Sequence, residues 1–207
     1  GFRLTVRGLT GGHSGMDIYK GRANANKLIN RGLLSAKEKF DLRISVIDGG
    51  GLRNAIPRES FAEVVIPAAD ADAFIALIKE EEKILQAEYK TTDPKLNIAA
   101  EKINTPDMVM VAAYQYALLR TIGACPNGIY RMSPEINGLV QTSNNLARVL
   151  VKDGGFKILC LTRSSVDSEK MDLAKTICYN FEMAGAKPEF GGSYPGWAPK
   201  PDAPIVK

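Results

Sequence analysis

The only histidine of the chain, His13, lies in the glycine-rich stretch RGLTGGHSGMD. Gly11 and Gly12 precede it, Ser14 follows it, and Gly15 comes next. Glycine reaches backbone angles that are closed to other residues, but it loses more conformational freedom on folding than they do. A loop that only turned the chain would not need three such residues. We therefore expect the loop to present the imidazole for function, against the alternative that His13 is a structural residue.

A single imidazole restricts the chemistry that this loop can perform. A zinc site needs three or four ligands from His, Cys, Asp and Glu, so we expect no metal site within the chain. A Ser-His-Asp arrangement is disfavoured because Ser14 stands directly beside His13 and no G-x-S-x-G motif occurs. The remaining role is that of a hydrogen-bond donor aimed at an oxygen that gains negative charge in a transition state. Such a donor can serve an active site on another domain.

The composition indicates a globular protein that binds neither nucleic acid nor membranes. The chain has 207 residues, of which 45% are hydrophobic and 24% charged. Its 27 Lys and Arg residues are spread along the chain and nearly balanced by 23 Asp and Glu residues, so nucleic acid is not an expected partner. The longest apolar runs are far shorter than the roughly 20 residues of a membrane span, and we expect a soluble protein.

The cysteines bear on the cellular compartment. Cys125, Cys160 and Cys178 are odd in number, widely spaced and set in apolar or helical contexts. No zinc-binding spacing exists among them. They fit reduced thiols better than a disulfide framework, which favours a cytoplasmic location.

The hydrophobic pattern of the first half predicts the order β-α-β-β-α-β. The expected elements are a strand at 2–7, a helix within 21–36, strands within 40–50 and 58–67, a helix at 70–89 and a strand within 95–103. Glycines in GGGLRNAIP supply a bend or bulge between the second and third strands. Pro67, Asp70 and Asp72 mark the start of the long helix. This order is that of a ferredoxin-like unit, in which two helices cover an antiparallel sheet.

The second half repeats much of this order as α-β-β-α-β. The expected elements are a helix at 105–123, strands within 139–151 and 156–164, a helix at 167–185 and a strand at 186–192. Thr105 as the N-cap and Pro106 at the first helical position mark the start of the first of these helices, and Gly123 marks its end.

These elements predict one fused α+β domain over residues 1–207. It consists of tandem ferredoxin-like halves at about 1–103 and 104–193, with the helices on one face of an antiparallel sheet. Residues 194–207 are expected to lead back toward another domain. The first residues, FRLTVR, already alternate as a strand with no targeting segment before them, and the last residues, PDAPIVK, end as abruptly. We therefore interpret the sequence as a fragment of a longer protein.

Six segments follow one another in a recognisable order: GLTGGHSGMDI, GRANANKL, GGGLRNAIPRESFAEVVIP, PEINGLVQTSNNLARV, ILCLTRSSVDS and GGSYPGWAPKPDAPI. Together they cover nearly the whole chain. The chain resembles the lid, or dimerisation, domain of the aminoacylase/dipeptidase family of co-catalytic zinc peptidases. Within that family it is most similar to the bacterial aminoacyl-histidine (Xaa-His) dipeptidases. In this family the lid interrupts a zinc-binding catalytic domain, which fits a fragment without a metal site.

The resemblance implies a function and roles for three residues. The intact enzyme would hydrolyse small dipeptides such as Xaa-His, with Zn²⁺ and a glutamate general base on the absent catalytic domain. His13 would stabilise the oxyanion of the tetrahedral intermediate, Asn145 would line the substrate pocket, and Arg163 would hold the terminal carboxylate of the substrate through two parallel hydrogen bonds. The implied partners are a dipeptide substrate and the protein's own catalytic domain, with a homodimer left open. The fragment alone is expected to be inactive.

Alternatives to these roles stay open. Arg163 could instead form a surface ion pair at a strand end. Asn54 is expected to shape the turn before the next strand, since asparagine tolerates left-handed angles and Pro57 sets the exit. Trp197 is expected to anchor the lid against the catalytic domain. Two other functional classes compete: a ferredoxin-like regulatory domain that binds a small molecule, and a purely structural dimerisation module in which His13 would be replaceable.

Overall fold

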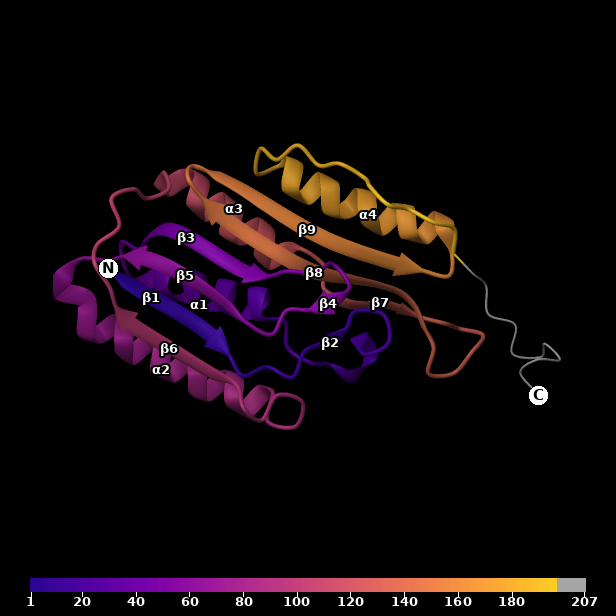
Figure 1. Cartoon of the computed structure of the whole chain (residues 1–207), viewed down its shortest axis with the longest axis horizontal. Helices are drawn as coiled ribbons and strands as arrows, with labels where there is room; N and C mark the ends of the chain where they lie inside the picture. The colour runs from indigo at the N-terminus through magenta and orange to yellow at the C-terminus, as the bar shows by residue number, and fades with distance from the viewer. Residues whose placement is uncertain (197–207) are drawn as a thin grey trace.

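The structure, a computed structural model, describes residues 1–196 and consists of a seven-stranded antiparallel sheet with helices on one face (Figure 1). The strands of this sheet are β1 (Phe2–Arg7), β3 (Arg43–Gly50), β5 (Ser60–Val65), β6 (Asn97–Lys102), β7 (Gly128–Met132), β8 (Val140–Lys152) and β9 (Gly155–Ser164). The helices are α1 (Ala25–Lys39), α2 (Ala71–Glu88), α3 (Ala112–Ala124) and α4 (Asp167–Glu182), with single 3₁₀ turns at η1 (Ile18–Lys20) and η2 (Ala68–Asp70). Strands β2 (Gly12–His13) and β4 (Ala55–Ile56) form a separate two-stranded sheet. The expected α+β fold class is confirmed.

The first half forms the predicted ferredoxin-like unit. Its strands lie in the order β6-β1-β5-β3, and each neighbouring pair is antiparallel. The alternation of β1 decides which face is buried, because successive side chains of a strand point to opposite faces. Phe2, Leu4 and Val6 are buried, whereas Arg3 and Arg7 are exposed. Helix α1 packs against β1, β3 and β5 and covers the apolar face.

Helix α1 begins where the sequence supplies a cap. Oδ1 of Asn24 accepts hydrogen bonds from the amides of Asn26 and Lys27 at 2.9 and 3.4 Å. This cap satisfies amide groups of the first turn that have no partner within the helix. The apolar face that follows is fully or almost fully buried at Leu28, Ile29 and Leu33.

The second half continues the same sheet. Strand β8 pairs with β3 through residues 148–151 and with β9 along its other edge. Helix α3 packs against α1, and α4 packs against α3 and β9, so the layer of helices is continuous as well. The close approach of β3 and β8 requires a glycine at position 50, because its φ is +73° and a Cβ there would collide with the carbonyl oxygen of Ala147.

The helix expected to begin at Thr105 begins at Ala112 instead. Its N-cap, Val111, has extended dihedral angles. The amide of Met110 donates to the carbonyl of Ile44 at 2.7 Å, so the preceding residues run beside β3 and do not coil. This tertiary hydrogen bond outweighs the local preference of Thr-Pro for a helix start.

The prediction of a strand at 186–192 is wrong. A strand that was not predicted, β7, forms at Gly128–Met132. After α4 the amide of Ala186 donates to the carbonyl of Phe181 at 3.1 Å, and the chain then continues without strand pairing. Pro188 has no amide hydrogen for a ladder, and the glycines at 191–192 weaken a strand. Strand β7 forms because β8 extends beyond β3 and leaves an edge to pair with.

Three further expectations concern the ends and surroundings of the chain. None of the helices in residues 1–196 combines the length and the apolar character needed to cross a bilayer. Trp197, the expected interdomain anchor, lies outside the described residues. The return segment 194–207 and the division into halves at about 1–103 and 104–193 stay predictions.

The core of the first half yields a stability prediction. Phe74 of α2 is fully buried, with its ring centroid 5.1 Å from that of Phe2 and 6.1 Å from that of Phe40. We expect Phe74→Ala to lower the free energy of unfolding by about 3–5 kcal/mol, because it removes buried apolar surface and leaves a cavity. Ile84→Ala, at a 39% exposed position of the same helix, should lower it by about 0.5 kcal/mol or less. Denaturant unfolding measures both values, and equal losses would contradict this placement of the core.

Candidate functional site

His13 lies in the short two-stranded sheet beside the main sheet. Strand β2 pairs with β4 so that His13 is opposite Ala55. The amide of Ser14 donates to the carbonyl of Asn54 at 2.8 Å, which continues the contact past the strand. Residues 54–56 therefore hold the backbone of the histidine loop in place.

Asp17 closes the loop around His13. Its Oδ2 accepts the amide hydrogen of His13 at 2.8 Å, and its own amide donates to the carbonyl of His13 at 2.9 Å. Its Oδ1 accepts from Nζ of Lys20 at 2.7 Å. The hydrogen bond from Lys20, followed by that from the His13 amide, lowers the pKa of Asp17 below its ordinary value. The carboxylate is therefore ionised at neutral pH, in the form that accepts these bonds.

A buried carboxylate anchors both ends of the same loop. Asp93 is 1% exposed, and it accepts the amide hydrogens of Thr10 and Ala23 at 2.8 and 2.9 Å on its two oxygens. Both ends of the histidine loop are thus hydrogen-bonded to the same side chain. Hydrogen bonds therefore restrain this loop at both ends and in its middle.

The hydrogen bonds of the imidazole make Nε2 its donor. Nδ1 of His13 accepts the amide hydrogens of Gly15 and Met16 at 3.2 and 3.1 Å. A neutral imidazole that accepts at Nδ1 carries its proton on Nε2. The side chain is half-buried, and Nε2 has no hydrogen-bond partner within residues 1–196. The ring therefore offers one oriented N–H group to a molecule outside the described chain.

Arg163, near the end of β9, has a guanidinium group without a carboxylate partner in the described part of the chain. Its Nη1 donates to Oη of Tyr194 at 3.3 Å, while Nε is buried and makes no hydrogen bond there. The alternative of a surface ion pair is thus not found among residues 1–196. The free donors of the guanidinium suit a carboxylate that comes from outside.

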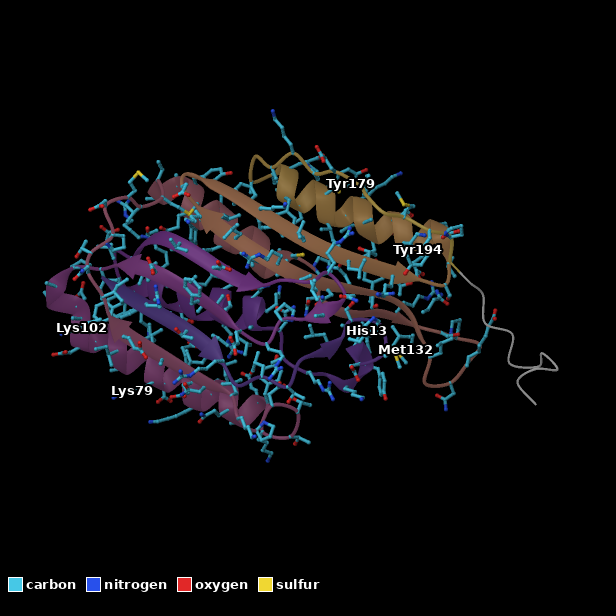
Figure 2. All side chains as sticks on the ribbon, in the orientation of Figure 1. His13, Lys79, Lys102, Met132, Tyr179 and Tyr194 are labelled. Carbon is cyan, nitrogen blue, oxygen red and sulfur yellow. The ribbon has the colours of Figure 1, made fainter. Side chains whose placement is uncertain are left out.

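Gly15 lies between the side chains of His13 and Arg163. A Cβ at this position would lie 3.2 Å from Cε1 of His13 and 3.4 Å from Nε of Arg163. The structure therefore brings together two of the three predicted site residues, although they come from opposite halves of the sequence. Figure 2 shows His13 toward the same end of the molecule as Tyr194, the partner of Arg163, and away from Lys79.

Asn145, the third predicted site residue, contacts β4, the strand that pairs with β2 at His13. It is 1% exposed on β8. Its Nδ2 donates to the carbonyls of Arg53 and Ala55 at 3.1 and 2.8 Å, and its Oδ1 accepts from Nδ2 of Asn24 at 3.4 Å. The amide thus supports β4 and, through it, the histidine loop. Its place in the lining of a substrate pocket stays a prediction.

Asn54 is a candidate site residue that the sequence assigned to a turn. Its side chain is exposed and makes no hydrogen bond within residues 1–196, and it precedes Ala55, the residue opposite His13. The prediction that Asn54 lies in a turn is confirmed, because the amide of Ala55 donates to the carbonyl of Leu52 at 3.1 Å around it. Its φ is not positive, since Asp153 is the only described non-glycine residue with a positive φ. The only feature of the sequence that could have indicated Asn54 as a site residue is its polar side chain directly before Ala-Ile-Pro. Its nearness to His13 depends on the pairing of two distant segments.

A groove of about 1340 Å³ runs along β9 and α4 and is bordered by residues 185–196. Near the end of β9 it is lined by Gly15, Arg53 and Arg163. Apolar side chains line much of the rest, among them Phe156, Ile158, Leu161, Ile177 and Phe181. The groove is large enough for a small organic ligand or a short peptide segment.

Three comparisons place this geometry among known proteins. Residues 4–93 match the family described as the peptidase dimerisation domain. The cytosol non-specific dipeptidase of Escherichia coli is 38% identical over 205 residues, which cover 99% of this chain and 42% of that protein. The crystal structure of the aminoacylhistidine dipeptidase from Vibrio alginolyticus matches with a TM-score of 0.94 and 40% identity, again over 99% of this chain and 42% of the other. The chain thus spans less than half the length of these relatives. The resemblance indicated by the motifs is confirmed: residues 4–93 match the peptidase dimerisation domain, and nearly the whole chain is similar to part of these two bacterial dipeptidases.

Proposed function

We propose that the chain is the lid domain of a cytoplasmic, zinc-dependent dipeptidase and supplies side chains to an active site on a catalytic domain outside the chain. Its substrates are small dipeptides, with Xaa-His as the favoured class. Both relatives bear dipeptidase names, and the chain spans 42% of each, which leaves room for a catalytic domain. The observation that carries the proposal is the convergence of His13 and Arg163 on either side of Gly15.

In this proposal, His13 acts on the carbonyl oxygen of the scissile peptide bond. The direction of its Nε2–H group is set by the two amides that bind Nδ1. When water adds to the carbonyl carbon, negative charge develops on this oxygen. A preorganised donor stabilises that state more than the bound substrate and so lowers the barrier. Since Asp17 and Asp93 hold the loop, the donor needs little rearrangement during the reaction.

Arg163 binds the C-terminal carboxylate of the substrate. Both His13 and Arg163 border Gly15, so the carboxylate would lie only a few bonds from the oxygen that His13 contacts. This short separation selects the peptide bond next to the C-terminal residue, which is the only peptide bond of a dipeptide. Asn145 orients the site through the carbonyls of Arg53 and Ala55, in addition to the pocket-lining role implied by the family.

The zinc ion belongs to the catalytic domain in this proposal. Within residues 1–196 no three side chains of His, Cys, Asp or Glu come together as a metal-binding group, and Nδ1 of His13 already accepts two amide hydrogens. Residues 1–196 therefore offer no binding group for a zinc ion of their own. When bound by the other domain, zinc would supply the activated water.

We further propose that a second copy of the chain is a partner, because residues 4–93 match a dimerisation domain. Strand β3 is covered by β8 of the same chain. The outer edge of β9, in contrast, pairs with no strand among residues 1–196. An unpaired edge offers N–H and C=O groups to a second strand. Phe190, which is 58% exposed, borders the same groove and would be covered in such a dimer.

The role of His13 can be tested in the full-length polypeptide. We expect His13→Ala to lower kcat by roughly 10²–10³, the usual loss for one oxyanion donor. KM, zinc content and melting temperature should change little, because the side chain is half-buried and meets the charge only in the transition state. Steady-state kinetics and thermal melts measure these values. Lys79→Ala, at an exposed position away from the site (Figure 2), is the matched control. A large drop in melting temperature with unimpaired turnover would show that His13 is structural.

The role of Arg163 can be tested with a substitution that keeps its charge. We expect Arg163→Lys in the full-length polypeptide to raise KM for dipeptides about tenfold or more with a smaller change in kcat. Lysine keeps the charge but loses the two-pronged geometry, and binding of the carboxylate persists from substrate to transition state. The comparison substrate is a dipeptide with an amidated C-terminus, which the wild type and the variant should cleave equally slowly. An unchanged KM for the free dipeptide would place the carboxylate elsewhere.

The proposed dimer can be tested by measuring the oligomeric state. Light scattering after size-exclusion chromatography is expected to give twice the mass of the chain, and Phe190→Asp should shift the protein to the monomer because it places a charge in the interface. Met108→Asp changes another exposed apolar side chain (68% exposed) and should leave the dimer intact. A monomeric mass for the wild type, or a dimer unaffected by Phe190→Asp, would exclude this interface.

A further inference from the structure

Two cysteines that are distant in the sequence lie side by side in the structure. Sγ of Cys125 and Sγ of Cys160 are 3.9 Å apart. Cys125 follows the last turn of α3, and Cys160 lies on β9 opposite Leu146. A disulfide needs an S–S distance of about 2.05 Å, so small side-chain rotations would bring the two sulfurs within bonding distance.

The surroundings of the pair favour a thiolate at Cys160. The contact with Cys125, joined by Asn144 and the positive charge of Lys27, lowers the pKa of Cys160. The same contact and burial raise the pKa of Cys125. Lys27 is held nearby because its Nζ donates to the carbonyl of Cys125 at 3.0 Å and to that of Gly123 at 2.6 Å. The ammonium group thus stays next to the pair.

The two thiols also differ in their access to solvent. Cys160 is half-buried and lines the groove along β9 and α4, whereas Cys125 is 2% exposed behind it. A small oxidant in the groove therefore meets Cys160 first. Cys125 is then placed to attack the oxidised sulfur from the protein side. Cys178 lines the groove as well and serves as an internal comparison.

We propose that Cys125 and Cys160 form a redox-active dithiol, which hydrogen peroxide converts into an intramolecular disulfide. The Cys160 thiolate attacks one peroxide oxygen, the O–O bond breaks, and Cys160 becomes a sulfenic acid as hydroxide leaves. The Cys125 sulfur then attacks the Cys160 sulfur. The S–S bond forms, the S–O bond breaks, and the oxygen leaves as water with the thiol proton of Cys125. Peroxide is thereby reduced by two electrons, one from each sulfur.

The test uses the folded, reduced chain. One equivalent of hydrogen peroxide is added, free thiols are alkylated, and the digest is analysed by mass spectrometry. We expect a peptide pair linked through Cys125 and Cys160, with Cys178 alkylated, and we expect dithiothreitol to restore all three thiols. Three alkylated thiols after peroxide treatment, or a link that includes Cys178, would overturn the proposal.

Variants separate the roles of the two sulfurs. Cys178→Ser should form the disulfide as the wild type does, and this variant leaves both proposed partners in place. Cys160→Ser should form none. In Cys125→Ala the sulfenic acid at Cys160 has no resolving partner, so dimedone should label Cys160. Labelling of Cys125 in the Cys160→Ser variant at the same rate would contradict the assigned order of attack. Circular dichroism checks that each variant is folded.

Discussion

The pairing of β8 with β3 is the constraint on which the rest of the structure depends. It is reinforced by Arg148, whose Nη1 donates to Asp48 and to the carbonyls of Gly49 and Gly50. Without it the ferredoxin-like half would end in an exposed edge strand, a site of unwanted association. Because β9 follows β8 after a short turn, the same pairing also carries Arg163 to the histidine loop.

Asparagine side chains, of which Asn24 and Asn26 are buried, hold the two halves together at this junction. Asn24, the cap of α1, donates from Nδ2 to Oδ1 of Asn127 at 2.9 Å and to the carbonyl of Leu146 at 3.0 Å. The same Oδ1 of Asn127 accepts the amide hydrogen of Leu146 at 3.0 Å, and Asn26 donates to the carbonyl of Leu146 at 3.2 Å. A buried polar group is costly when it loses its partner, so these bonds disfavour any other alignment of the halves. The two halves that carry the proposed site are therefore held in one alignment.

Most of the fold could be predicted from the sequence, because burial leaves a local trace in the spacing of apolar residues. The alternation of Phe2, Leu4 and Val6 marked a half-buried strand, and the structure contains it. The predicted elements were wrong where a contact between segments distant in the sequence overrode the local conformational preference. The start of α3 depends on the hydrogen bond between Met110 and Ile44, for which residues 105–111 carry no local signal. Strand β7 depends on how far β8 extends beyond β3.

For the site, the sequence supplied the chemical groups and the resemblance: one histidine among glycines, an arginine at a strand end, and motifs in a recognisable order. The folded chain adds that His13 and Arg163 meet at Gly15, that Nδ1 is bound so that Nε2 is the donor, and that Cys125 lies beside Cys160. The physical reason is that these contacts join segments far apart in the chain. Sheet register and helix packing set such contacts, and local residue spacing encodes neither.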